Sequence, residues 1–242
     1  MIIDGQQRVL VFSAHAADFC SRAGGTIARY VDAGSTVHVC DMTFGERCEA
    51  AALWAANPRS SIDEIKSARQ VEIDAAARIL GASIECFDFD DCPLVIGPQR
   101  KLQIVEAIRS ARPDIVLTHW VDDVCHPDHV EATRAVLWAC AYCGVAGLDV
   151  AGEPWETPEI IFYETTVFRA PAARFLPQIY VDISGVFERK LEALEKLAAQ
   201  PGLPEMYDVL GRYRGMEARD SAGLSDCRYA EGFVPFSAQG IA

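Results

Sequence analysis

Two clusters of histidine and aspartate in this chain have the residue types and spacing of a metal site. His15 and Asp18 lie three positions apart after an apolar run, and His126 and His129 lie three apart after another, far downstream. Imidazole and carboxylate groups bind catalytic zinc, with a further position open for water or substrate. Three of the five histidines fall in these clusters, so we predict that the clusters meet at one metal ion.

The segments around these clusters alternate between apolar runs of strand length and amphipathic helical patterns. This succession predicts an α/β, Rossmann-like fold with a mostly parallel sheet and helices on both faces. Both clusters then follow strands at their carboxyl ends, where open α/β sheets bind ligands. We find no repeat or linker and predict one domain over residues 1–242. Strands are expected at 8–14, 36–44, 83–89, 114–120, 159–166 and 178–183, and helices at 23–33, 62–80, 99–111, 127–143, 186–199 and 204–219.

The bulk composition excludes several kinds of protein. A formal net charge of −13 over 242 residues disfavours nucleic acid as a partner, because polyanion-binding proteins carry a basic face. No apolar run reaches the length that spans a membrane. The nine cysteines are irregularly spaced, and the first eight residues do not read as a secretion signal, so we expect free thiols in the cytoplasm. The sequence leaves a homo-oligomer open.

The two clusters also carry a family resemblance. Residues 14–18 (AHAAD) and 126–129 (HPDH) resemble the two motifs of the PIG-L (LmbE-like) deacetylase family, usually AHPDDE and HPDH. The resemblance spans about residues 8–236 and implies the fold of that family, with His15, Asp18 and His129 as the ligands of Zn²⁺. Further similar landmarks are Gly24, Gly25, Gly45, Glu46, 181–184, Lys190 and 229–233.

The first motif differs from the family pattern at the position of the general base. The first Asp of that motif is the general base of the deacetylases, and here it is Ala17; Ala16 and Phe19 replace the Pro and the Glu. A positioned acid or base contributes about 10²–10⁴-fold to a rate. The chain is therefore a weak or idle hydrolase, or it uses a base from another segment.

Residues 43–49 (TFGERCE) offer that base. The family turn accounts for Glu46 but not for Glu49, so Glu49 is our first candidate and Glu46 the alternative. Together with AHAADF, this segment resembles an atypical hydratase branch of the family, the 4-oxalomesaconate hydratases of aromatic-acid catabolism. The resemblance implies water addition to a carbon–carbon double bond conjugated with a 2-oxo acid. His126, oriented by Asp128, would then donate or hold a proton.

An anionic oxo-acid substrate of this kind requires cationic partners. Arg47 is the first candidate for a bidentate carboxylate clamp, since guanidinium matches carboxylate geometry. Two alternatives stay open at this point: a zinc deacetylase of an N-acetyl sugar or related amide, with a replaced base, and a catalytically idle metal-binding protein. Further candidate substrate contacts are Arg22, Arg59, Arg169 and His119.

Overall fold

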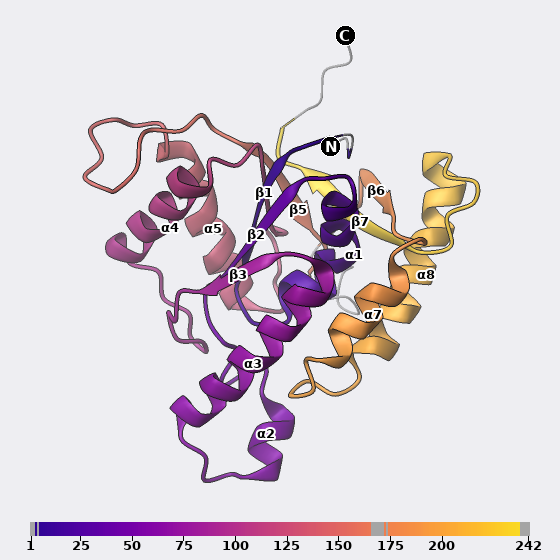
Figure 1. The fold of residues 1–242 in the computed structure, drawn as a ribbon, viewed down its shortest axis with the longest axis horizontal. Coiled ribbons are helices and arrows are strands. Elements are labelled where there is room, and N and C mark those ends of the chain that lie inside the picture. The colour runs from indigo at the N-terminus through magenta and orange to yellow at the C-terminus, as the bar shows by residue number, and fades with distance from the viewer. Residues whose placement is uncertain (1–2, 4, 166–171, 173, 238–242) are drawn as a thin grey trace.

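The centre of the computed structural model, which describes residues 3, 5–165, 172 and 174–237, is a seven-stranded sheet. The strand order is β3-β2-β1-β4-β5-β7-β6 (Figure 1). The strands are β1 (Arg8–Ser13), β2 (Thr36–Asp41), β3 (Ser83–Cys86), β4 (Ile115–His119), β5 (Glu159–Tyr163), β6 (Ile179–Asp182) and β7 (Ala230–Pro235). The helices are α1 (Asp18–Asp32), α2 (Ala51–Ala56), α3 (Ile62–Leu80), α4 (Pro98–Ala111), α5 (Pro127–Tyr142), α7 (Phe187–Glu195) and α8 (Leu203–Ala222).

The sheet is mostly parallel, which confirms the predicted α/β class. Strands β3, β2, β1, β4 and β5 run parallel, each joined to its neighbour through parallel ladders. Strand β7 was not predicted; it inserts between β5 and β6 and is antiparallel to both. Its sequence AEGFVP gives a weak strand signal because a glycine and a proline interrupt it.

Helices cover both faces of the sheet and create two apolar cores. In Figure 1, α4 and α5 lie on one side of the sheet, while α1, α3, α7 and α8 lie on the other. Strands β1 and β4, at the middle, are buried almost throughout. Such two-sided burial is the reason why both read as continuous apolar runs in the sequence.

Helix ends show where sequence reasoning succeeds and fails. The spacing of Ser61 and Glu64 in the sequence predicts a capping box. Helix α3 begins with this box and ends at Gly81, whose φ is 83°. Helix α1, expected from residue 23, begins at Asp18 instead. The earlier start places Asp18 in the first helical turn, where its carboxylate accepts the backbone N–H of His15 at 3.0 Å.

Two broader expectations concern cysteines and membranes. All nine cysteines lie in the described part of the chain, and each is a free thiol. Among the helices described, none combines the length and the apolar composition needed to cross a bilayer.

Candidate active site

His15, Asp18 and His129 come together at the carboxyl ends of β1 and β4. Their ligand atoms lie within 4.8 Å of one another, and all three side chains are buried. Oδ2 of Asp18 lies 3.4 Å from both Nδ1 of His15 and Nε2 of His129. The two distant motifs therefore meet at one point, as the strand order requires.

Each of these two imidazoles is oriented by a carboxylate on its far side. Asp128 Oδ2 lies 3.3 Å from Nε2 of His15, and Asp123 Oδ2 lies 2.8 Å from Nδ1 of His129. The nitrogens that face Asp18 have no hydrogen-bond partner although they are buried. Metal-binding histidines have this arrangement, with one nitrogen fixed by a carboxylate and the other free for the ion. The residues present therefore fit a divalent metal.

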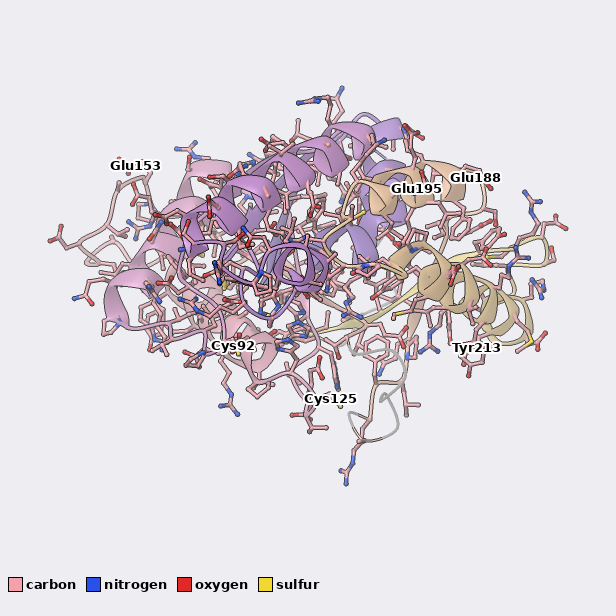
Figure 2. The ribbon with its side chains drawn as sticks, turned by 90° about the horizontal axis from the view of Figure 1, so that it is seen from below. Cys92, Cys125, Glu153, Glu188, Glu195 and Tyr213 are labelled. Carbon is pink, nitrogen blue, oxygen red and sulfur yellow. The ribbon has the colours of Figure 1, made fainter. Side chains whose placement is uncertain are left out.

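Backbone amides in turn hold the two orienting carboxylates. Asp128 accepts the N–H groups of Cys92 and Leu94, each at 3.0 Å, and Asp123 accepts the N–H of Cys125 at 3.0 Å. Figure 2 shows Cys92 and Cys125 on the same lower side of the molecule. Two loops, one after β3 and one after β4, thus fix the ligand geometry through backbone hydrogen bonds.

The electrostatics of this centre favour a bound cation. Burial opposes a charge on His15, but the carboxylates of Asp128 and Asp18 outweigh it and raise its pKa well above the ordinary value. Burial likewise opposes a charge on His129, whose pKa is raised by Asp18 and Asp123. The Asp18 carboxyl, although buried, has a pKa held well below its usual range by the neighbouring imidazoles. A divalent ion bound to the ligand nitrogens would take the place of these protons.

Glu49 brings a further carboxylate to the centre from the loop after β2. Its side chain is buried, with Oε1 3.8 Å from Nδ1 of His15. Its Oε2 accepts the backbone N–H of Ala17 at 3.4 Å. A carboxylate thus lies directly at the position where the first motif has lost its own.

Gly45 and Arg69 position this carboxylate. Gly45 has φ of +63°, and a Cβ built there would lie 2.8 Å from Cβ of Glu49. The Gly45 carbonyl accepts the N–H of Glu49 at 2.9 Å. The guanidinium of Arg69, which is fully buried, lies 3.8 Å from Oε2 of Glu49 through Nη2. Sequence reasoning missed Arg69, although it occupies the apolar stripe of α3 between Ile65 and Ile73.

Glu46 and Arg47 contact neighbouring residues of the loop after β2. Nη1 of Arg47 contacts Glu46 Oε1 at 2.9 Å and Asp91 Oδ1 at 3.2 Å. The Asp91 carboxylate also accepts the backbone N–H groups of Arg47 and Cys48. Nη1 of Arg47 is therefore engaged within its own loop while the side chain stays 40% exposed, and the carboxylate clamp stays a prediction. Asp91 was missed, and its sequence neighbours gave no signal of this role.

Of the other predicted arginines in the described part of the chain, Arg22 contacts a predicted metal ligand. Its Nε is 3.6 Å from Asp18 Oδ1, and its Nη1 donates to the carbonyl of Thr165 at 2.7 Å. Arg59 is exposed in the loop between α2 and α3, where its backbone N–H donates to Asn57. Arg169 lies outside the described residues. The contact of Arg22 with a substrate stays a prediction.

Comparison with known proteins assigns the family. A model of the PIG-L family, described as GlcNAc-PI de-N-acetylase, matches residues 10–140. The chain belongs to the PIG-L family. Its relatives are enzymes. The ligand cluster at the carboxyl ends of β1 and β4 agrees with the metal dependence of PIG-L proteins.

Relatives within the PIG-L family include hydratases and deacetylases. A 4-oxalmesaconate hydratase of Pseudomonas putida is 33% identical over 230 residues, covering 94% of this chain and 88% of the relative. The crystal structure of GalB, the 4-carboxy-2-hydroxymuconate hydratase of that species, superimposes with a TM-score of 0.91 at 31% identity, covering 98% and 99% of the two chains. A diacetylchitobiose deacetylase of Thermococcus kodakarensis is 30% identical over 240 residues, covering 95% and 84%.

His126 of this PIG-L chain packs against the ligand histidines. Its ring stacks on His129 with centroids 4.2 Å apart and lies 4.6 Å from the ring of His15. Burial and the neighbouring imidazoles lower its pKa to about 4, so it is neutral at pH 7. The expectation that Asp128 orients His126 is wrong, because the Asp128 carboxylate is turned toward Nε2 of His15. The first turn of α5 separates the two side chains of the HPDH motif.

His119 supports the loop after β1 that carries His15. It is completely buried, and its Nε2 accepts the backbone N–H of Ala14 at 2.9 Å. Its ring stacks on His129 with centroids 4.0 Å apart. Burial, together with His129, lowers its pKa well below the ordinary value. The sequence leaves two roles open for His119, contact with the substrate or support of the loop, and this hydrogen bond agrees with the second.

Proposed function

We propose that this PIG-L enzyme is a zinc-dependent hydratase that adds water to a carbon–carbon double bond conjugated with a 2-oxo acid. The observation that carries the proposal is the Glu49 carboxylate at the N–H of Ala17, beside His15. The deacetylase base is missing, yet a carboxylate from another loop faces the same metal centre. The likeness to hydratases of 4-oxalmesaconate and 4-carboxy-2-hydroxymuconate supports a substrate of that class, in aromatic-acid catabolism.

His15, Asp18 and His129 would hold the zinc ion. A nitrogen, nitrogen and oxygen ligand set suits zinc and leaves a position open. When bound, zinc supplies a Lewis acid that polarises the 2-oxo group and favours the enolate that develops during water addition. The orienting carboxylates of Asp123 and Asp128 raise the basicity of the two imidazoles and fix their rotation.

Glu49 and His126 divide the proton transfers in this proposal. Glu49 takes one proton from the attacking water, whose oxygen bonds to the β-carbon while the electron pair of the double bond moves toward the 2-oxo group. The α-carbon of the resulting enolate then takes a proton from the N–H of His126, and the proton held on Glu49 restores that N–H, so that one water is added with no net change in protons. Burial and the neighbouring imidazoles lower the pKa of His126 to about 4, so it would act here as a neutral imidazole.

A substrate with several carboxylates requires positive charge in an otherwise acidic site. Arg22, beside Asp18, is the arginine that the geometry favours for this contact. We retain Arg59 and Arg169 as further candidates for this contact.

The proposal is tested by metal analysis combined with a paired substrate assay. The purified chain should hold zinc and should bleach the near-ultraviolet absorbance of an oxalomesaconate-type acid, since hydration removes its conjugation. The same sample should release no amine from N-acetylglucosamine derivatives. Amine release without bleaching would replace the hydratase with a deacetylase, and inactivity in both assays despite bound zinc would favour the idle metal-binding protein.

A further inference from the structure

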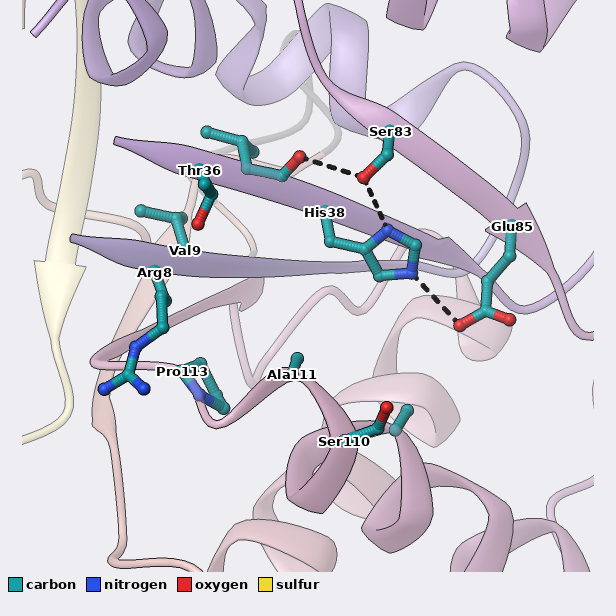
Figure 3. A pocket seen from close by; sticks show the side chains of 11 residues that line it. Arg8, Val9, Thr36, His38, Ser83, Glu85, Ser110, Ala111 and Pro113 are labelled. Carbon is teal, nitrogen blue, oxygen red and sulfur yellow. Dashed lines mark hydrogen bonds and ion pairs between the residues drawn. The ribbon is translucent and has the colours of Figure 1, made fainter. Parts of the chain in front are cut away.

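A second group of metal-ligating side chains lies on β2 and β3, away from the catalytic centre. His38, Cys40 and Glu85 offer ligand atoms within 4.8 Å of one another. The parallel register pairs His38 with Ser83 and Cys40 with Glu85, so all four side chains share one face of the sheet. Figure 3 shows His38 between Ser83 and Glu85.

Ser83 and Glu85 flank the imidazole of His38, one at each ring nitrogen. Ser83 Oγ lies 2.8 Å from Nδ1 of His38 and donates to the carbonyl of Val37 at 3.3 Å. Nε2 of His38 lies 3.1 Å from Oε1 of Glu85. In the tautomer that carries its proton on Nδ1, the lone pair of Nε2 is available to a cation shared with the Glu85 carboxylate.

The third donor completes a ligand set of mixed type. Sγ of Cys40 lies 3.4 Å from the same Oε1 of Glu85, and the Cys40 side chain is fully buried. In tetrahedral zinc sites with bonds of about 2.0–2.3 Å, neighbouring ligand atoms lie about 3.3–3.8 Å apart. Two edges of this triangle, Nε2–Oε1 at 3.1 Å and Sγ–Oε1 at 3.4 Å, are close to that spacing.

The cluster is open to solvent on one side. His38 and Glu85 line a cavity of about 320 Å³ between the sheet and α4, together with Arg8, Thr36 and Ser110 (Figure 3). The side chains of His38 and Glu85 are 33% and 50% exposed. An ion can therefore enter from this cavity and keep a fourth position for water or a small ligand.

We propose that His38, Cys40 and Glu85 form a second site for a zinc-type divalent ion, separate from the catalytic one. The ion would join the short edge strand β3 to β2. The thiol proton and any proton on His38 are released when the ion binds, since thiolate and neutral imidazole are the ligating forms. This second site does not depend on the hydratase reaction.

Cobalt distinguishes this site from the catalytic one by its ligands. The metal-free full-length chain is titrated with Co²⁺ while the near-ultraviolet absorbance is followed. We expect two equivalents per chain and a thiolate-to-cobalt charge-transfer band, because the catalytic ligands contain no sulfur. Cys40→Ser should abolish the band. Cys86→Ser, on the same strand pair, and Cys48→Ser, near the catalytic centre, should keep it.

A second pair of variants covers the case in which Cys40→Ser does not fold. His38→Gln and Glu85→Gln change partly exposed side chains, and each should weaken binding of the second equivalent at least about tenfold while the first is unchanged. Uptake of a single equivalent without the band would overturn the proposal and leave His38 and Glu85 as an ion pair. A band that persists in Cys40→Ser, or disappears in Cys48→Ser, would also overturn it.

Discussion

The backbone N–H of Ala17 donates a hydrogen bond to the carboxylate of Glu49 at 3.4 Å. Position 17 carries the base in PIG-L deacetylases, as the motif resemblance implies, and here it offers only its backbone. The carboxylate therefore reaches the same centre from the loop after β2. The proposed hydratase reaction relies on this change in the approach direction of the base, with the predicted ligand set unchanged.

Replacement of Glu49 separates proton transfer from metal binding. Glu49→Gln keeps the shape of the side chain but removes its basicity, so turnover in the hydration assay should fall at least about 10²-fold. Zinc content should equal that of the wild type. Glu46→Gln is the comparison, because Glu46 is engaged with Arg47 and should affect turnover less than stability. Unchanged turnover in Glu49→Gln would eliminate it as the base.

Substitution of Gly45 should lower turnover because it displaces Glu49. Gly45→Ala introduces a side chain at φ +63° and a Cβ 2.8 Å from Cβ of Glu49, so the loop must shift. We expect lower turnover with zinc binding retained. Gly147→Ala is the control, since a Cβ there meets no atom within 4 Å. Equal turnover in the two variants would show that the loop tolerates the shift.

The orienting carboxylates should govern metal affinity. Asp123→Asn removes the charge that fixes Nδ1 of His129, and such changes typically lower metal affinity about 10–100-fold. Competition with a chelator measures the effect. Asp122→Asn, at the exposed neighbouring position, should leave the affinity unchanged. A similar loss in both variants would assign the effect to loop charge in general.

His126 should contribute to the pH dependence of stability in the metal-free chain. Its pKa is about 4 in the folded state and near 6.5 when unfolded, so the unfolded state binds more protons between these values. Its contribution to stability therefore declines as pH falls from 6.5 toward 4. Denaturant unfolding at pH 7 and pH 5 should show a smaller difference in His126→Gln than in the wild type. An NMR titration that places the pKa of His126 at 6.5 would contradict this.

The sequence predicted what depends on local pattern. The apolar runs of the strands, the capping box at Ser61 and the metal motifs each have a signature within a few residues. The sheet order then brought His15 and His129 together without further assumptions. Partners set by tertiary packing were beyond this reasoning. Asp128 turned toward His15 rather than His126, because the loop containing Cys92 fixes its rotation from outside the motif.

The partners of two arginines were also set by tertiary packing and could not be predicted from the sequence. Arg47, beside two acidic residues in the sequence, looked available but is engaged within its own loop. Arg69 was not among the candidates, yet it is fully buried beside Glu49. The available signal was a charged residue at a position of α3 where the helical period places apolar side chains.

The metal ligands come from β1 and β4, which are neighbours in the middle of the sheet but far apart in the sequence. His15 follows β1, while His129 and its neighbour Asp128 begin α5, and 113 positions separate His15 from Asp128. An ion bound by these ligands would be a reversible cross-link between the two segments, and an amino-terminal fragment that lacks α5 has only two of the three ligands. Complete ligation requires that β4 is paired with β1, so metal binding would add to the free energy that holds this central strand pair together.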